Sequence, residues 1–259
     1  MVEGTEGSVT SARVPVTHSR VMGGATAPDD ERDSGAAGEG AEHGGVHPAS
    51  AASPTIVLAS GSRYRAELLA ESGIAVEIDP PDVDERALDA RLSDLGADGL
   101  AVELARLKAD DVAPRHRGRT VVAADQVGVI ETVSGRSVLL TKQADVDAAV
   151  AQLMVLSGTR HHLVNGVVVV SHSGVVSTGV DVQVVTMRAF TEAEARDYVV
   201  AFEPFDTSGS YRLEDGDELE RRHGAGAALV ASVSGEDPSG VLGMPMPLLR
   251  RMLADIDRL

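Results

Sequence analysis

Short apolar runs alternate with amphipathic segments from residue 55 onward, and this alternation constrains the fold more than any other feature of the chain. The run TIVLA (55–59) predicts a buried strand, and RYRAELLAESG (63–73) predicts a helix closed by its final glycine. A second strand is predicted at AVEI (75–78), before the break at Pro80 and Pro81. Strands and helices in alternation are typical of an α/β fold.

The same pattern continues toward the C-terminus. Later helices are predicted at 98–113, 144–156 and 191–202, and one more closes the chain. Strands are predicted at 120–124, 137–140 and 226–233, together with a long hairpin over 162–187. Asp125 and Gln126 are predicted to interrupt the strand that begins at 120, which then continues extended over 127–133. We therefore expect one α/β domain over residues 55–259, with a mixed, twisted sheet flanked by helices.

The composition limits what can fill the core. Three Phe, three Tyr and no Trp leave Val, Leu and Ala as the main core residues. The absence of Cys excludes disulfides and thiolate metal sites. No apolar run approaches the roughly 20 residues that span a bilayer, and no basic segment precedes an apolar one at the N-terminus. We expect a soluble protein of the cytoplasm.

The formal net charge of −17 bears on the partners of the protein. Such a charge argues against extended contact with nucleic-acid backbone or with an anionic membrane. A small anionic ligand remains compatible with it, because a local cluster of donors suffices to bind one.

Residues 1–54 differ from the rest of the chain. They contain nine Gly, no aromatic residue, and eight acidic residues against three Arg, without helical or alternating apolar periodicity. Such a composition cannot bury enough surface to offset its chain entropy, so we predict a disordered tail. A start codon assigned too far upstream would produce the same pattern.

Lysine is scarce in this sequence. The chain uses 21 Arg but only two Lys, Lys108 and Lys142. One interpretation is codon bias with two remaining lysines. The other is that both sites need a compact ammonium, which the flat guanidinium of Arg does not replace.

The turn after the first predicted strand is rich in hydroxyls and cations. In IVLASGSRYRAELL, the strand stops at Ser60-Gly61-Ser62, and Arg63 and Arg65 follow at once. Free N–H groups at a helix N-terminus bind phosphate well, and nearby Arg side chains add charge-assisted hydrogen bonds. Ser62 could equally serve as an ordinary helix cap.

Three further polar positions suggest chemistry. Asp125 lies in an apolar strand region, where a carboxylate is costly unless a cation, a metal or hydrogen-bond donors meet it. A turn whose Asp bonds to nearby backbone is the structural alternative. The loop DVDE (82–85) offers carboxylates at a spacing usable by a hard divalent cation, although acidic loops are common in so acidic a chain. Lys142 can reach the sheet edge where ligands of α/β proteins gather.

Taken in order, these segments resemble a known family. The motifs LASGSRYRAELL, VDE, ELARLKA, AADQV, LTKQAD and GSYRLED look like those of the Maf family, whose members are nucleoside triphosphate pyrophosphatases. The resemblance covers about residues 55–255 and implies a cleft that holds a nucleotide. It also implies hydrolysis between the α and β phosphates, as house-cleaning of the nucleotide pool, by a protein expected to form a homodimer.

The resemblance assigns roles to individual residues. Ser60, Ser62 and Arg65 would hold the triphosphate, and Lys108 and Lys142 would neutralise it further. Glu85 and Asp125 would bind a divalent cation (Mg, Mn or Co), and Asp125 would also accept the proton of the attacking water. Both lysines of the chain fall on lysine positions of the family, which favours the functional interpretation of their scarcity.

The family divides by substrate. One branch, with Asp-Thr and a later Gln, takes dTTP and UTP, whereas another, with Asp-Gln and a later Glu, takes 7-methyl-GTP. This chain resembles the second branch through Gln126, Glu214, and Tyr64 at the position where that branch has Trp. A positively charged methylated guanine would be favoured by an acidic side chain and a stacking aromatic ring.

The chain also departs from the family pattern. Arg63 replaces a proline, Ala66 replaces a second arginine, and Gln143 follows Lys142 where the family has proline. Residues 215–223 look like an insertion beside the substrate loop. The alternatives are therefore dTTP or UTP as substrate, or a nucleotide-binding regulator of cell division with little turnover.

Overall fold

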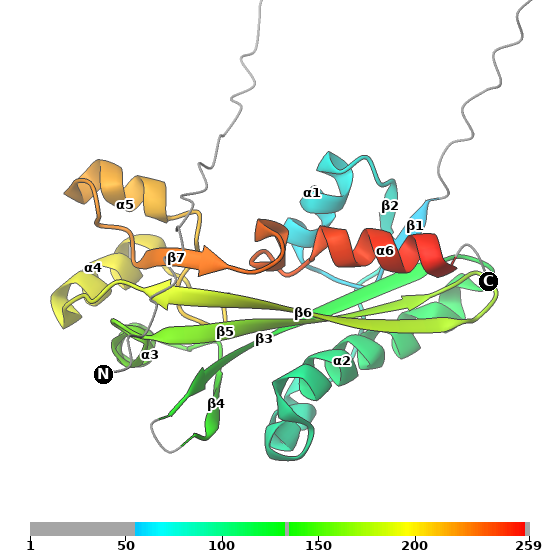
Figure 1. Cartoon of the computed structure of the whole chain (residues 1–259), viewed down its shortest axis with the longest axis horizontal. Helices are drawn as coiled ribbons and strands as arrows, with labels where there is room; N and C mark the ends of the chain where they lie inside the picture. The colour runs from blue at the N-terminus through cyan, green and yellow to red at the C-terminus, as the bar shows by residue number, and fades with distance from the viewer. Residues whose placement is uncertain (1–54, 133–134, 257–259) are drawn as a thin grey trace, which may run out of the picture. The chain divides into compact units, whose positions relative to one another are not determined.

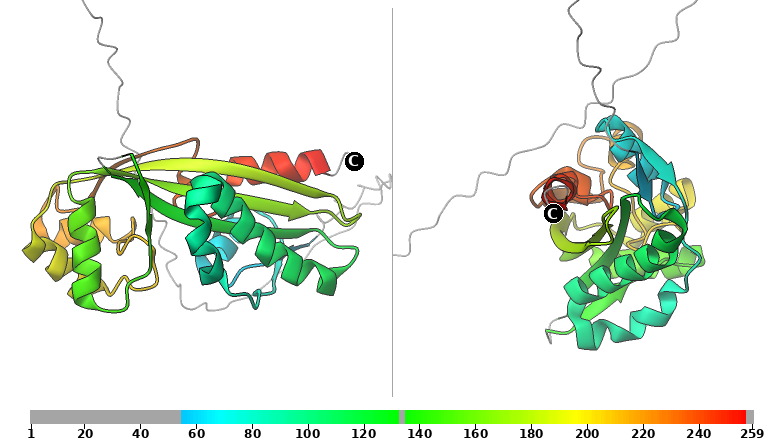
Figure 2. Two further views of the ribbon diagram at one scale, coloured as in Figure 1. Left: turned by 90° about the horizontal axis from the view of Figure 1, so that it is seen from below. Right: turned by 90° about the vertical axis from the view of Figure 1, so that its right-hand side faces the viewer.

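The structure is a computed structural model that describes residues 55–132 and 135–256. The tail predicted at residues 1–54 lies outside the described residues. Figures 1 and 2 show the described helices and strands, coloured along the chain.

The described elements alternate as the sequence predicts. The strands are β1 (Ile56–Leu58), β2 (Val76–Ile78), β3 (Val121–Glu131), β4 (Ser137–Leu140), β5 (Arg160–Val170), β6 (Val176–Met187) and β7 (Val230–Ser234). The α-helices are α1 (Arg63–Glu71), α2 (Leu92–Val112), α3 (Val146–Leu156), α4 (Glu192–Phe202), α5 (Gly216–His223) and α6 (Met246–Ile256). Short 3-10 helices are η1 (Glu85–Arg91), η2 (Ala113–His116) and η3 (Pro238–Gly240).

The strands form one mixed sheet of seven strands, which confirms the predicted fold class. Its order is β2-β1-β3-β5-β6-β7, and β4 pairs with β3 beside this path. β1 runs parallel to β2 and β3, whereas the later pairings are antiparallel. The three long strands β3, β5 and β6 run through the whole sheet (Figure 1).

One edge of β3 is shared by two short strands. Because β5 pairs with Val121 to Val129 of β3, both β1 and β4 must use the opposite edge. β1 pairs there only with Val121 and Val122, and β4 pairs only from Gly128 onward. Within the described sheet, residues 123–127 of β3 therefore have a strand partner on one side only.

Helices cover both faces of the sheet. α2 packs on one face against β3 and β5, and α6 packs on the other with α1 nearby (Figures 1 and 2). A separate core cluster joins α3 and α4 to the far ends of the long strands. At Gly166 the contact with α2 is so close that a Cβ would lie 2.2 Å from the carbonyl carbon of Ala101, so only glycine fits. This close packing brings the side chains of α2 down onto β3.

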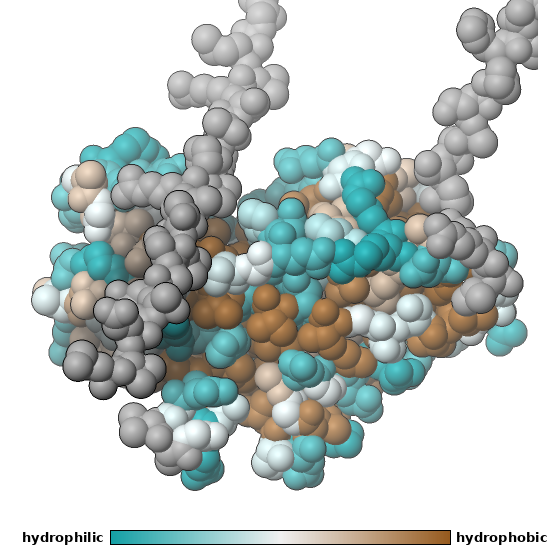
Figure 3. All heavy atoms as spheres, viewed as in Figure 1, coloured by the Kyte–Doolittle hydropathy of each residue, from teal (hydrophilic) through white to brown (hydrophobic). Residues whose placement is uncertain are grey.

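The outward row of β6 leaves apolar side chains on the surface. Val176, Val180 and Val182 are exposed, and alternate with buried residues such as Asp181 and Gln183. Figure 3 shows hydrophobic residues across the middle of this face, next to the hydrophilic surface of α6. Among the described residues, no helix has both the length and the apolar character needed to cross a membrane.

The predicted interruption at Asp125 and Gln126 is wrong. β3 is one continuous strand in which Asp125 lies opposite Gly166 and Gln126 lies opposite Asn165. The strand accommodates the carboxylate because a cation on α2 meets it, so the backbone does not need to turn. That partner is 17 positions away in the sequence, outside the range of any local pattern.

Several boundaries also differ from the prediction. α2 begins at Leu92 rather than 98 and bends at Gly96, where φ is +67°. β7 begins at Val230 rather than 226. The segment 215–223, interpreted as an insertion, contains α5, and its Leu219 packs into the core cluster of α3 and α4.

Candidate active site

A large cleft opens along the unpaired edge of β3. It has a volume of about 1450 Å³ and reaches from the turn after β1 to the connection between β4 and α3. All ten residues selected from the sequence line it: Ser60, Ser62, Tyr64, Arg65, Glu85, Lys108, Asp125, Gln126, Lys142 and Glu214. The sheet explains the convergence, because the gap between β1 and β4 exposes one strand edge between two groups of helices.

Arg65 is buried at one end of the cleft. Its Nε donates to the carbonyl oxygen of Gly243 at 2.8 Å, and its Nη1 donates to Ser60 Oγ at 3.1 Å. Burial lowers the pKa of Arg65, and the charges of Asp125 and Glu85 oppose that shift. Arg stays charged in proteins even so, so this guanidinium is a fixed cation facing the cleft.

The serine turn is arranged around the same guanidinium. Ser60 Oγ also accepts a hydrogen bond from the backbone N–H of Ser62 at 3.2 Å. Ser62 occupies the N-cap position of α1, yet its hydroxyl makes no capping hydrogen bond in the described structure. The capping alternative is therefore not supported, and the hydroxyl lies on the wall of the cleft.

Lys108, on α2, joins the two carboxylates expected to bind metal. Its Nζ donates to Asp125 Oδ1 and lies 3.1 Å from Glu85 Oε1. Lys108 and Asp125 are only 6% and 7% exposed, so each depends on the other to offset the cost of a buried charge. The buried stripe of α2 includes Leu104 and Lys108, and this periodicity directs the ammonium toward β3.

Asp89 is a member of this cluster that the sequence analysis missed. It lies on η1, four residues after Glu85, and also lines the cleft. Burial raises its pKa, Arg86 lowers it, and the charges of Asp125 and Glu85 raise it further. The acidic run DVDERALD contained Asp89, but the sequence analysis selected carboxylates only from the loop 82–85.

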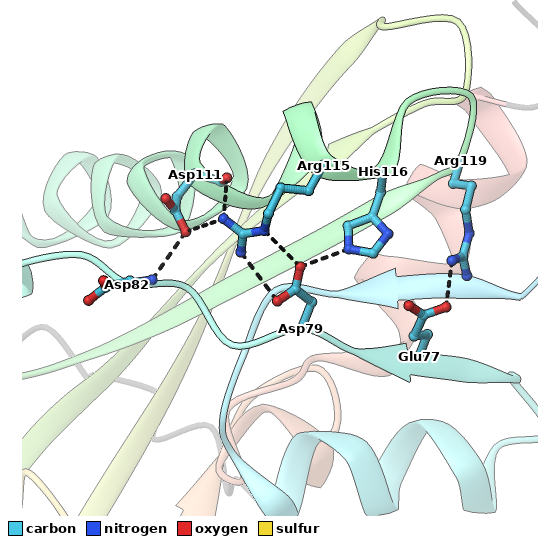
Figure 4. A network of polar contacts seen from close by, with 7 residues as sticks. All are labelled: Glu77, Asp79, Asp82, Asp111, Arg115, His116 and Arg119. Atoms are coloured by element: carbon cyan, nitrogen blue, oxygen red, sulfur yellow. Dashed lines mark hydrogen bonds and ion pairs between the residues drawn. The ribbon is translucent and has the colours of Figure 1, made fainter.

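A network of charged residues fixes the loop that carries Glu85 (Figure 4). Asp111, near the end of α2, accepts from the backbone N–H of Asp82 at 3.1 Å and from Arg115 Nη1 at 3.1 Å. Asp79 accepts from Arg115 Nε at 3.0 Å and lies 2.7 Å from His116 Nε2.

These contacts hold both ends of the loop against α2, because Lys108 contacts Glu85 and Asp111 contacts Asp82. Hydrogen bonds from Arg115 and then His116 lower the pKa of Asp79. The hydrogen bond from Asp82 and then that from Arg115 lower the pKa of Asp111. Both carboxylates therefore stay ionised at neutral pH, and the loop keeps its anchors.

Tyr64, which follows Arg63 on α1, and Glu214 also line the cleft. Burial raises the pKa of Tyr64, and so do the charge of Glu214 and a hydrogen bond to it. The guanidinium of Arg63 lies 5.8 Å from the centre of the Tyr64 ring. Because Tyr64 and Glu214 are neighbours, the structure brings together two of the three residues on which the substrate branch depends.

Buried tyrosines support the loop before Glu214. The Tyr198 hydroxyl donates to Asp215 Oδ2 at 2.7 Å and accepts from the backbone N–H of Arg212 at 2.9 Å. Tyr211 is buried and its hydroxyl lies 2.8 Å from Nε2 of His161, a fully buried residue. Burial lowers the pKa of His161 to about 4, so this histidine is neutral. The motif GSYRLED contained Tyr211 and Arg212, but the sequence analysis assigned no role to either.

Gln126 and Lys142 lie on different parts of the wall. Adjacent residues of a strand point to opposite faces, so Gln126 points away from Asp125, toward η3. Its Nε2 donates to the carbonyl oxygens of Gly240 and Val241 at 2.9 and 3.1 Å. Lys142 is exposed, in the connection between β4 and α3.

The carboxylates fit a metal only together with a ligand. In the described part of the chain, no group of three or more His, Cys, Asp or Glu could hold a metal ion by itself. Glu85 and Asp125 nevertheless contact the same nitrogen atom, so their carboxylates lie close together. Mg²⁺ binds through one or two carboxylates plus substrate phosphates, and this pair fits that arrangement.

The chemistry available at the site follows from these contacts. Cationic and hydroxyl groups from Ser60, Ser62, Arg65, Lys108 and Lys142 can hold an anion. Asp125 is a buried base within the same cleft and can take a proton from a water molecule placed beside that anion.

Comparison with known proteins identifies a family profile and several relatives that match this chain. The profile of the Maf-like protein family matches residues 55–256 of this chain. A 7-methyl-GTP pyrophosphatase of Nitrosococcus oceani is 34% identical over 205 residues, which cover 79% of this chain and 94% of the relative. A dTTP/UTP pyrophosphatase of Deinococcus radiodurans is 38% identical over 200 residues, covering 77% and 92%.

A solved structure is also similar in part. It is a nucleoside-triphosphatase, a dITP/XTP pyrophosphatase, of Mycobacterium abscessus, with a TM-score of 0.28 and 18% identity. The match covers 51% of this chain and 72% of the other. So low a similarity carries no argument, and the sequence relatives alone define the family.

Proposed function

The chain belongs to the Maf-like protein family, and from this membership we propose that it is a nucleoside triphosphate pyrophosphatase. In the proposed reaction, water attacks the α-phosphate, the bond to the β-phosphate breaks, and a nucleoside monophosphate and pyrophosphate leave. The observation that carries the proposal is the buried Asp125, which lies beside the fixed cations Arg65 and Lys108 in one cleft. A cleft built only to bind a nucleotide would not need a buried carboxylate next to its phosphate site.

The phosphates would bind to the turn after β1. Arg65 is held on two sides by Gly243 and Ser60, so its position does not depend on the ligand. A cation fixed in this way loses little entropy when it stabilises the charge that develops during phosphoryl transfer. Lys142, on the exposed wall, would meet the phosphates from the other side.

Asp125 would act as the general base. Lys108 holds its Oδ1 and thereby fixes the direction of the carboxylate. The proton of the attacking water moves to the Asp125 carboxylate while the pyrophosphate leaves with its electron pair. Glu85 keeps the second contact to Lys108, so the ammonium retains an anionic partner when Asp125 becomes protonated.

A divalent cation is part of the proposal. Glu85 and Asp125 would hold Mg²⁺, Mn²⁺ or Co²⁺ together with the phosphates of the substrate. When bound, such a cation neutralises charge on the phosphates and makes the attacked phosphorus more electrophilic.

For the base we propose 7-methylguanine. Glu214 and Tyr64 are neighbours, and a cationic ring stacked on the face of Tyr64 beside this carboxylate is favoured by both. The alternative within the same activity is dTTP or UTP, because a relative with 38% identity carries that name. We place the reaction in the cytoplasm, where it would act on the nucleotide pool, and a homodimer is the assembly to test by light scattering.

A nucleotide panel tests the proposal. Pyrophosphate release is measured with 7-methyl-GTP, dTTP, UTP and GTP in the presence of Mg²⁺, Mn²⁺ or Co²⁺, with Asp125→Asn as the matched inactive control. We expect release by the wild type only, fastest with 7-methyl-GTP. No release from any nucleotide, despite measurable binding, would favour the regulator and overturn the enzyme.

A further inference from the structure

A short segment on the cleft wall accepts hydrogen bonds from Arg65 and from the sheet. Residues 240–243, here named the 240–243 segment, run from the last residue of η3 toward α6 and line the cleft with their last three residues. Gly240 and Gly243 at its two ends are both buried. Side chains from three different elements donate hydrogen bonds to its carbonyl oxygens.

The C-terminal end of the segment determines how Arg65 is held. Gly243 accepts from Arg65 Nε, although the two residues are 178 positions apart. Gly243 has φ +83°, a conformation that favours glycine, and a Cβ there would lie 3.1 Å from Arg65 Nη2. The guanidinium therefore rests directly on the backbone of the segment, and a shift of the segment moves the guanidinium.

The N-terminal end is held by two amides from the sheet. Gln126 Nε2 donates to the carbonyl oxygens of Gly240 and Val241 at 2.9 and 3.1 Å, and to Asn165 Oδ1 at 3.1 Å. Asn165 Nδ2 donates to the carbonyl oxygen of Gly240 at 2.8 Å. One carbonyl group of the segment thus receives two donors, from neighbouring residues on β3 and β5.

A buried carboxylate supports these amides in turn. Asp181 Oδ2 accepts from Asn165 Nδ2 at 3.0 Å and from Gln183 Nε2 at 2.9 Å. Asn165 is fully buried and Gln183 is 1% exposed. Gly240 lies against this cluster so closely that a Cβ would be 2.4 Å from Asp181 Oδ2. Burying such groups is costly, and a connected polar network of this kind makes its surroundings rigid.

We propose that Gln126 and Asn165 are positioning residues, which fix the guanidinium of Arg65 for the phosphates by holding the 240–243 segment. The proposal rests on the proposed function, which gives Arg65 its phosphate. It assigns Gln126 a task that is independent of the base. The 240–243 segment acts through Arg65 on the triphosphate, which all nucleoside triphosphates share.

The test uses Gln126→Met, which keeps the length of the side chain and removes its donors. Calorimetry measures the affinity for inorganic pyrophosphate in the full chain with Mg²⁺, and kinetics gives kcat and KM for the nucleotide panel. Because small displacements of positioned groups are costly, we expect pyrophosphate to bind at least tenfold more weakly. All nucleotides should lose turnover efficiency by the same factor, with their ranking unchanged.

A double-mutant cycle with Arg65→Ala separates positioning from general damage. Without Arg65, Gln126→Met should change the pyrophosphate affinity less than twofold. An equal loss with and without Arg65 would overturn the inference, and so would a changed nucleotide ranking with unchanged pyrophosphate affinity. A wild type that releases pyrophosphate from no nucleotide would instead overturn the proposed function.

Two further variants provide a second test and a control. Gly243→Ala disturbs the guanidinium from the segment itself and should reproduce the loss even if Gln126→Met folds poorly. Ser157→Ala is the matched control, because Ser157 Oγ exchanges two hydrogen bonds with the backbone of Phe190, away from the cleft. The control should keep full pyrophosphate affinity. A similar loss in the control would mean that any loosened loop has this effect, and would overturn the assignment.

Discussion

The two ends of the cleft share β3 as their floor but are built in different ways. At the phosphate end, Arg65, Lys108 and Asp125 are buried, and each is held by residues of other elements. At the proposed base end, Glu214 is exposed, and buried residues support only the loop that carries it. Under the proposed function, the residues that would act on every substrate are therefore rigid, whereas Glu214, which would select the substrate, can change without disturbing the core.

The first prediction concerns the phosphate end, where the largest loss is expected. Asp125→Asn should lower turnover 10²- to 10⁴-fold, because loss of a general base costs that much. It should also lower the free energy of unfolding by about 1–3 kcal/mol, because Lys108 stays buried with one partner fewer. Pyrophosphate release and urea unfolding measure the two effects. Full activity in the variant would remove Asp125 from the mechanism.

The second prediction concerns the base end, where ranking should change rather than stability. Glu214→Gln should shift the ratio of turnover efficiencies from 7-methyl-GTP toward dTTP or UTP by about ten- to hundredfold, the value of one charged contact. Its urea midpoint should stay that of the wild type, since Glu214 is exposed. An unchanged ratio would show that Glu214 does not read the base.

The third prediction compares the two lysines directly. Lys108→Arg should cost at least tenfold in turnover efficiency, because a forked guanidinium does not fit the buried position between Asp125 and Glu85. Lys142→Arg should cost only about twofold, since an exposed cation can act on phosphate from a distance. Equal losses in the two variants would mean that the burial of a lysine does not determine how well it tolerates replacement by arginine.

The fourth prediction concerns acid. The pKa of His161 is about 4 in the folded protein, against its ordinary value of 6.5. Between pH 4 and pH 6.5, this histidine therefore binds a proton in the unfolded chain but not in the folded protein. Stability is therefore full above pH 6.5 and decreases as pH falls toward 4, by about 1–2 kcal/mol between pH 7 and pH 5. Urea unfolding at both pH values measures it. His161→Gln should reduce this difference, and a difference that stays the same in that variant would assign it to other groups.

The alternation of apolar runs was sufficient to predict most elements and the mixed sheet. It failed at Asp125, because the ammonium that stabilises this carboxylate comes from α2 and no local pattern reports it. It also failed at the start of α2, since the helix continues on both sides of Gly96, where the backbone is not helical.

The candidate site shows the same division between local motifs and distant contacts. The serine turn, both lysines and the acidic positions lie in recognisable motifs, and the structure brings them into one cleft. The sequence analysis missed the 240–243 segment, since its contact with Arg65 spans 178 positions. Gln126 was found through its motif, yet the direction of its amide required knowledge of which helix covers each face of β3.

The gap in the pairing of β3 has a further consequence, for the behaviour of the protein in a crowded solution. A strand edge without a partner is a template on which another chain can add a strand and start aggregation. Here the free stretch is residues 123–127, and residues 125–127 line a cleft. A charged side chain, Asp125, lies within it, and inward-pointing charge is one of the means by which proteins protect such edges. The cleft thus lets a small molecule reach this edge of β3, while the charge within the cleft protects the same edge from pairing with another polypeptide.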